Sequence, residues 1–119
     1  MSDTLLPEKA IQEALAGLPG WRLEAGRLHR EYRCNGWRAA VLLFDGIAHL
    51  AEAAWHHPDV TVSWGRVAVS LTTHSAGGIT RKDLELAAEI ERLATWRPAP
   101  GSALEGAPEE GCWRYREPE

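Results

Sequence analysis

The chain has 119 residues, of which 45% are hydrophobic and 25% charged, with a formal net charge of −4. These values indicate one soluble globular domain, and the 11 arginines among its 13 basic residues are too scattered to predict nucleic-acid binding. With no membrane-spanning apolar run, no signal-peptide pattern and only Cys34 and Cys112 as cysteines, we expect a cytoplasmic protein without a disulfide framework.

The predicted elements alternate between helices and hairpins. They are a helix at 7–16, a hairpin at 21–34, a helix at 36–55, a hairpin at 60–72 and a helix at 80–95. Apolar residues recur at a 3.6-residue period in the helices and alternate in the hairpins. Thr80, with Asp83 three residues on, forms a capping-box pattern that opens the last helix. Because hairpins imply antiparallel pairing, the order predicts an α+β fold: three helices covering one face of a four-stranded antiparallel sheet.

The helix at 36–55 has more apolar surface than one buried face requires. Its helical-period stripe consists of Trp37, Val41, Phe44, Ala48, Ala51 and Trp55, and the surface is widened by Leu42, Leu43, Ile47 and Leu50. Such a helix is typically buried on two sides, with the core on one and a subunit on the other. We therefore expect a homodimer or homotetramer, formed through this helix or through a sheet edge.

The composition changes after residue 96. Residues 97–119 hold four of the seven prolines, so we expect a domain at 1–96 followed by an irregular tail. The segment CWRYR at 112–116 alternates aromatic and charged residues. It either docks as an edge segment through Trp113 and Tyr115 or stays undocked.

Three histidines and an aspartate are expected to converge at one end of the sheet. Pro58 disfavours helical backbone at the residue before it, so the long helix should stop at about His56. The strand after His57 pairs with the strand before His74, and the next loop leads within nine residues to Asp83. Imidazole both donates and accepts protons near neutral pH, so this cluster suits general acid–base catalysis.

Each of these residues also has a purely structural interpretation. Histidine is favoured at helix C-termini, and Glu52, one turn before His56, would form an ordinary surface pair with it. A helix cap alone would account for Asp83. A zinc site of Glu52, one of the adjacent histidines and His74 is a further alternative, although the HExxH pattern is absent. No GxSxG motif or phosphate-binding glycine loop is present.

With these residues identified, the sequence resembles the pterin-4a-carbinolamine dehydratase family. The matching positions, each at the family's spacing, are Glu52, His56-His57-Pro58, Asp59, Trp64, Thr73-His74 and Asp83. The resemblance covers about residues 5–95. It implies dehydration of 4a-hydroxytetrahydrobiopterin to the quinonoid dihydropterin, which recycles the pterin cofactor of aromatic amino acid hydroxylases. It implies no metal and no other cofactor, because the pterin is the substrate.

The resemblance also implies residue roles. His56, His57 and His74 would line the pterin site and be its catalytic residues. Among them, we ourselves expect His57 and His74 to transfer protons and His56 to bind the ring. The supporting or substrate-binding residues would be Glu52, Pro58, Trp64, Thr73, Ser75 and Asp83. Some family members carry a glutamate and a cysteine where this chain has Ser75 and Ala76. Relatives with this fold also act without catalysis, as a transcription-factor dimerisation cofactor or as RuBisCO assembly factors, so an interaction protein is the alternative function.

Overall fold

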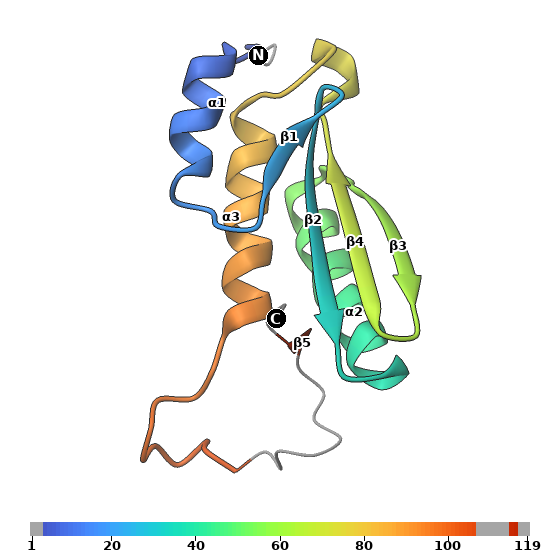
Figure 1. Cartoon of the computed structure of the whole chain (residues 1–119), viewed down its shortest axis with the longest axis vertical. Coiled ribbons are helices and arrows are strands. Elements are labelled where there is room, and N and C mark those ends of the chain that lie inside the picture. The colour runs from blue at the N-terminus through green and yellow to red at the C-terminus, as the bar shows by residue number, and fades with distance from the viewer. Residues whose placement is uncertain (1–3, 107–114, 117–119) are drawn as a thin grey trace.

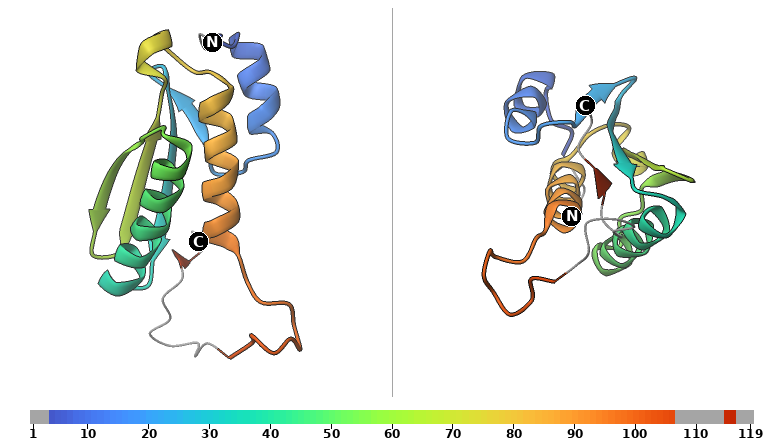
Figure 2. Two further views of the ribbon diagram at one scale, coloured as in Figure 1. Left: turned by 180° about the vertical axis from the view of Figure 1, so that it is seen from behind. Right: turned by 60° about the horizontal axis from the view of Figure 1, so that its bottom comes forward.

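The structure, a computed structural model, describes residues 4–106 and 115–116. Its elements are α1 (Glu8–Leu15), β1 (Arg22–Glu24), β2 (Arg27–Cys34), α2 (Trp37–Ala54), β3 (Asp59–Ser63), β4 (Arg66–Leu71), the 3₁₀ turn η1 (His74–Ala76), α3 (Arg81–Thr95) and β5 (Tyr115–Arg116). Strands β1 to β4 form an antiparallel sheet in the order β1-β2-β4-β3. All three helices lie on one side of this sheet (Figures 1 and 2), which confirms the predicted α+β fold.

Buried and more exposed side chains alternate along β2 and β4, so the two faces of the sheet differ. On the covered face, Leu28 of β2 is paired with Leu71 of β4, and neither has any exposed surface. On the opposite face, His29, Ser70 and Asp59 form a polar row across β2, β4 and β3. The core therefore lies between the sheet and the helices, and the other sheet face carries mostly polar side chains.

The buried side of α2 differs from the predicted stripe. Its buried residues are Ala39, Ala40, Leu43, Ile47 and Ala51. Trp37 is instead 55% exposed, and Trp55 lies beyond the end of the helix and is 75% exposed. Because α2 is apolar around most of its girth, the helical period alone did not determine which stripe faces the core.

Two element boundaries near the histidines also differ from the prediction. Helix α2 ends at Ala54 rather than at about His56, because Trp55 adopts left-handed backbone with φ of 51°. Strand β4 ends at Leu71, one residue before the predicted end of the hairpin, and His74 begins η1. Both differences change the directions in which the histidine side chains leave the backbone.

The C-terminal segment contributes a short strand to the sheet. Tyr115 and Arg116 pair antiparallel with Cys34 and Arg33, at the end of β2. They lie along the same edge of β2 as β1, which pairs only with the first residues of that strand. The predicted docking of Trp113 lies outside the described residues. In the part of the chain that the structure describes, no helix has the length and apolar character needed to cross a membrane.

A part-buried carboxylate fastens the C-terminal half of α3 to the sheet. Glu91 Oε1 accepts hydrogen bonds from Trp21 Nε1 at 2.9 Å, Tyr32 Oη at 2.6 Å and Arg30 Nε at 3.1 Å. Burial by itself would raise the pKa of Glu91, but the hydrogen bonds from Arg30 and Tyr32 and the charge of Arg30 outweigh it. The pKa of Glu91 therefore lies below its ordinary value, and the carboxylate stays charged at neutral pH.

Replacing Glu91 with glutamine should strongly destabilise the protein. The substitution removes the carboxylate that faces the Arg30 side chain, which is only 6% exposed. Because removing one partner of a buried ion pair typically costs about 3–5 kcal/mol, we expect the free energy of unfolding in a urea titration to fall by about 3 kcal/mol. Glu89→Gln is the matched control: Glu89 pairs with Arg92 on the surface of the same helix, and its loss should cost less than about 1 kcal/mol.

The same titration repeated at lower pH checks this assignment. A carboxyl whose pKa is lower in the folded state stabilises the fold above its unfolded pKa of about 4.3, and this stabilisation is lost as the pH falls through the folded pKa. The stability difference between the wild type and Glu91→Gln should therefore shrink below about pH 4. A difference that stays constant down to about pH 3 would contradict this role of Glu91.

Candidate active site

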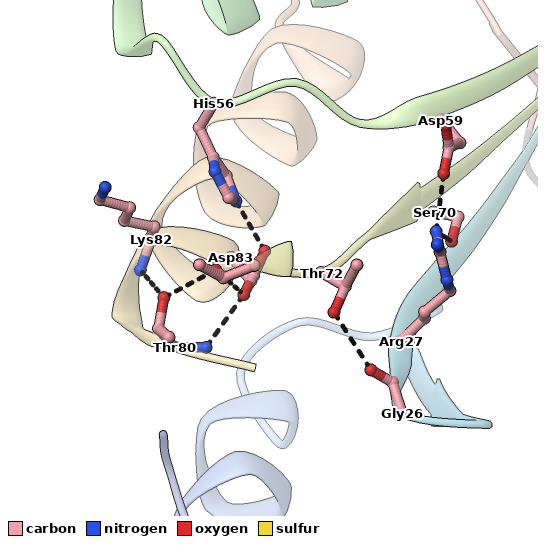
Figure 3. A network of polar contacts seen from close by, with 10 residues as sticks. Gly26, Arg27, His56, Asp59, Ser70, Thr72, Thr80, Lys82 and Asp83 are labelled. Carbon is pink, nitrogen blue, oxygen red and sulfur yellow. Dashed lines mark hydrogen bonds and ion pairs between the residues drawn. The ribbon is translucent and has the colours of Figure 1, made fainter. Parts of the chain in front are cut away.

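Asp83 lies at the centre of the predicted site and has no exposed surface. It stands in the first turn of α3, where the predicted capping box with Thr80 is present. Its Oδ2 accepts hydrogen bonds from Thr73 Oγ1 at 2.7 Å and from the Thr80 backbone nitrogen at 2.9 Å, while Oδ1 faces His56 Nε2 at 2.7 Å. Figure 3 shows His56 reaching toward Asp83 from the segment between α2 and β3. One carboxylate thus joins three separate parts of the chain.

These hydrogen bonds determine which nitrogen of His56 carries a proton. Oδ2 of Asp83 already accepts two hydrogen bonds, from Thr73 Oγ1 and from the Thr80 backbone nitrogen. An ionised carboxylate can only accept, so Nε2 of His56 must donate. Nδ1 is then the acceptor of the neutral ring or the second donor of the imidazolium. The His56 side chain is only 11% exposed, so its orientation is restrained by its surroundings.

His57 points in a different direction and forms a second pair with a carboxylate. Its Nε2 lies 2.7 Å from Oε1 of Glu52, whereas the sequence predicted Glu52 to pair with His56. The left-handed backbone at Trp55 explains why Glu52 contacts His57 and not His56, because it turns the chain out of the helix before either histidine. The rings of Trp55 and His57 meet edge to face, with centroids 5.0 Å apart. The His57 side chain is 48% exposed, so it is far more accessible than His56.

His74 lies at the same end of the sheet but in neither pair. It begins η1, and Thr73 immediately before it is bonded to Asp83. Its side chain is exposed. Within residues 4–106 and 115–116, no group of three His, Cys, Asp or Glu side chains is placed to hold a metal ion. This geometry does not support the zinc alternative of Glu52, an adjacent histidine and His74.

The remaining predicted site residues are divided between this end of the sheet and the other. Pro58 is half-buried and leads from His57 into β3, and Ser75 is exposed on η1. Trp64 instead lies in the turn after β3, at the opposite end of that strand. A Cβ atom at Gly36, just before α2, would lie 3.8 Å from Cζ2 of Trp64. The structure therefore does not bring Trp64 to the histidines.

An ion pair on the polar face of the sheet holds the start of β3. Arg27 Nη1 lies 2.7 Å from Asp59 Oδ2 and 3.2 Å from Ser70 Oγ (Figure 3). Asp59 directly follows Pro58, so the pair anchors the segment carrying both histidines across β4 to β2. This contact was not predictable from the sequence, because Arg27 and Asp59 are 32 residues apart and meet only through the strand order.

A cavity of about 380 Å³ opens beside His56, between α2 and α3. Leu50 and Leu86 contribute apolar surface to its wall, and Lys82 stands with two glutamates among its polar lining. The volume lies within the range of small-molecule pockets. Because His56 lines this cavity and also bonds to Asp83, it links the open space to the buried carboxylate. Lys82 was not predicted at the site, since only its place in the first turn of a helix was apparent from the sequence.

Sequence comparisons identify similar proteins over most of the chain. A family model described as Pterin 4 alpha carbinolamine dehydratase matches residues 4–93. A Chloroflexus aurantiacus protein named "Putative pterin-4-alpha-carbinolamine dehydratase" is 46% identical over 88 residues, covering 74% of this chain and 95% of the relative. An Aquifex aeolicus protein of the same name is 42% identical over 88 residues, covering 74% of this chain and 89% of the relative.

Two solved structures are also similar. The crystal structure of a transcriptional coactivator/pterin dehydratase from Brucella melitensis has a TM-score of 0.73 at 30% identity, covering 76% of this chain and 99% of that one. A pterin dehydratase-like protein, described as a RuBisCO assembly factor in the alpha-carboxysome, has a TM-score of 0.53 at 18% identity, covering 65% and 89%. The second similarity concerns the fold alone.

Trp55 provides a test of the backbone geometry that separates the two histidines. A left-handed backbone costs a residue with a Cβ atom about 1 kcal/mol or more, whereas glycine adopts it readily. Since both substitutions remove the same exposed indole, Trp55→Gly should be more stable than Trp55→Ala by about 1 kcal/mol in urea unfolding. An alanine variant at least as stable as the glycine variant would show that Trp55 is not held in this conformation.

Proposed function

The chain belongs to the pterin 4 alpha carbinolamine dehydratase family, and we propose that it dehydrates 4a-hydroxytetrahydrobiopterin to the quinonoid dihydropterin in the cytoplasm. The observation that carries the proposal is the pair of adjacent imidazoles, each held through Nε2 by a carboxylate. In the reaction the bond between C4a and oxygen breaks, the hydroxyl leaves as water once protonated, and a ring nitrogen loses a proton. Positioned imidazoles can supply both the acid and the base.

His57 and His74 are the proposed proton-transfer residues. Both side chains are exposed, so a substrate can reach them without displacing the protein core. Glu52 engages Nε2 of His57, which leaves Nδ1 to accept a proton or, in the imidazolium, to donate one. His74 supplies the complementary step. Removing either imidazole would leave one of the two proton transfers to water.

His56 is the proposed ring-binding residue. It lines the cavity between α2 and α3, and Asp83 restrains its ring from the buried side. With Nε2 committed to Asp83, Nδ1 is available to accept a hydrogen bond from an N–H group of the pterin. The apolar wall that includes Leu50 and Leu86 suits the flat faces of a bicyclic heteroaromatic ring.

Substitution of the histidines tests these roles. We expect His57→Ala and His74→Ala each to lower kcat by about 10²-fold, because each removes a positioned acid or base. His56→Ala should instead chiefly raise KM, because it removes a binding contact. The measurement is steady-state dehydration of a synthetic 4a-hydroxypterin by purified protein, followed by its absorbance change.

His49→Ala is the control, because His49 is exposed on α2 and takes part in none of the hydrogen bonds described above. If the purified wild type does not accelerate dehydration and the His57 and His74 variants match it, the proposed activity is wrong. Recovery of RuBisCO subunits or a transcription factor with the protein would then support the alternative, a non-catalytic interaction protein. The exposed apolar surface of α2 is the observation that favours this alternative.

We also infer that the protein forms a homodimer or homotetramer through α2 or through the edge of β3. On α2, Trp37 is 55% exposed and Leu42 is 45% exposed, beside the half-buried Val41 and Phe44. Strand β3 pairs only with β4 among the described residues, so its outer edge offers unpaired backbone groups. Both surfaces can bury area against a second copy of the chain.

Light scattering on size-exclusion fractions tests the oligomer. If α2 forms the contact, Trp37→Glu should shift the measured mass toward the monomer, because a carboxylate would be buried in the interface. Trp96→Glu is the matched control, since Trp96 is 52% exposed but lies outside α2. An unchanged mass in both variants would assign the contact to the β3 edge, and a monomeric wild type would overturn the inference.

A further inference from the structure

A chain of hydrogen bonds behind Asp83 is not used by the proposed reaction. The hydroxyl oxygens of Thr80 and Thr73 lie 2.9 Å apart. Thr73 Oγ1 donates to Asp83 Oδ2 at 2.7 Å, and the backbone nitrogen of Lys82 donates to Thr80 Oγ1 at 3.2 Å. Thr80 and Thr73 are only 2% and 4% exposed, so water does not compete freely for their hydroxyls.

Counting the available protons determines the direction of each hydrogen bond in this series. A threonine hydroxyl has one proton to donate. Thr73 gives its proton to Asp83, so in the bond between the two hydroxyls Thr80 must be the donor. The Lys82 backbone N–H can only donate, so Thr80 Oγ1 is its acceptor. All the donors therefore point from the start of α3 toward the carboxylate that holds His56.

We propose that Thr80 is a positioning residue that controls the orientation and protonated nitrogen of His56, acting through Thr73 and Asp83. Because Thr80 donates to Thr73 Oγ1, the Thr73 hydroxyl stays directed at Oδ2 of Asp83. Hydrogen bonds arranged in such a chain strengthen one another. With Oδ2 satisfied by Thr73 and the Thr80 backbone, Oδ1 is left to the Nε2–H group of His56.

This role is separable from the part that Thr80 plays as a helix cap. A cap needs only an acceptor for the backbone N–H groups of the first turn. Here the same hydroxyl also donates to Thr73, which lies outside the helix. Thr73→Val interrupts this series of hydrogen bonds next to Asp83 without altering the cap. Thr80→Val breaks it one step earlier and removes the cap as well.

The test is a double-mutant cycle read by nuclear magnetic resonance on protein with ¹⁵N-labelled histidine. The measured quantity is the exchange rate of the Nε2–H proton of His56 with water. We expect Thr80→Val to increase this rate about fivefold, which corresponds to the free energy of one ordinary hydrogen bond. Thr80→Ser should leave the rate within about twofold of the wild-type value. In the Thr73→Val background, Thr80→Val should have no further effect, because the link through which it acts is already absent.

Thr95→Val is the control on the same helix, because the Thr95 hydroxyl donates only to the backbone oxygen of Glu91. It should leave the exchange rate unchanged. Should Thr80→Val fail to fold, Thr80→Gly gives the same test, since glycine at this position costs the cap only a few tenths of a kcal/mol. An unchanged exchange rate, or fully additive effects in the cycle, would overturn the proposal and leave Thr80 as a cap alone.

A kinetic measurement connects this role to catalysis. It is the only part of the test that rests on the proposed function. Thr80→Val should raise KM for the pterin about fivefold with kcat near the wild-type value, and Thr80→Ser should restore KM. A fall in kcat without a change in KM would contradict positioning of a ring-binding histidine. If the wild type shows no dehydration, the proposed function fails, while the exchange rates still decide the role of Thr80.

Discussion

The site depends on the negative charge of Asp83, which has no contact with solvent. A buried carboxylate is tolerated only when its oxygens are satisfied, and here the donors come from the segment after β4, the residue capping α3 and the segment after α2. If any of these segments moved away, part of the charge would be left without a donor. The position of His56 is therefore maintained by the same interactions that hold the fold together.

The two adjacent histidines occupy opposite environments. His56 is 11% exposed and faces a carboxylate with no exposed surface, whereas His57 is 48% exposed and faces one that is 68% exposed. A restrained imidazole suits recognition, because little conformational freedom is lost on binding, and an accessible one suits proton exchange. One left-handed residue, Trp55, produces this division by turning the chain before the pair.

The parts of the fold and site that were predictable are those whose partners are close in sequence. The capping box needs only Thr80 and Asp83, and a hairpin needs only a turn to bring the segments around His56 and Thr73 to one end of the sheet. The partner of Glu52 was predicted wrongly, since no local rule favours left-handed backbone at a tryptophan. Trp64 has the family spacing, yet an extended strand carries it away from the histidines. No local pattern indicated that Glu91 meets Tyr32, 59 residues away.

Two carboxylates bond helix α3 to the rest of the protein in addition to its apolar core contacts: Asp83 near its beginning and Glu91 two turns later. An inserted residue between them would rotate the second half of the helix by about 100° and advance it by about 1.5 Å. Only one of the two carboxylates could then reach its donors. The eight-residue interval therefore has a fixed length, and changes in chain length during evolution or design are restricted to the loops and to the segment after the helix.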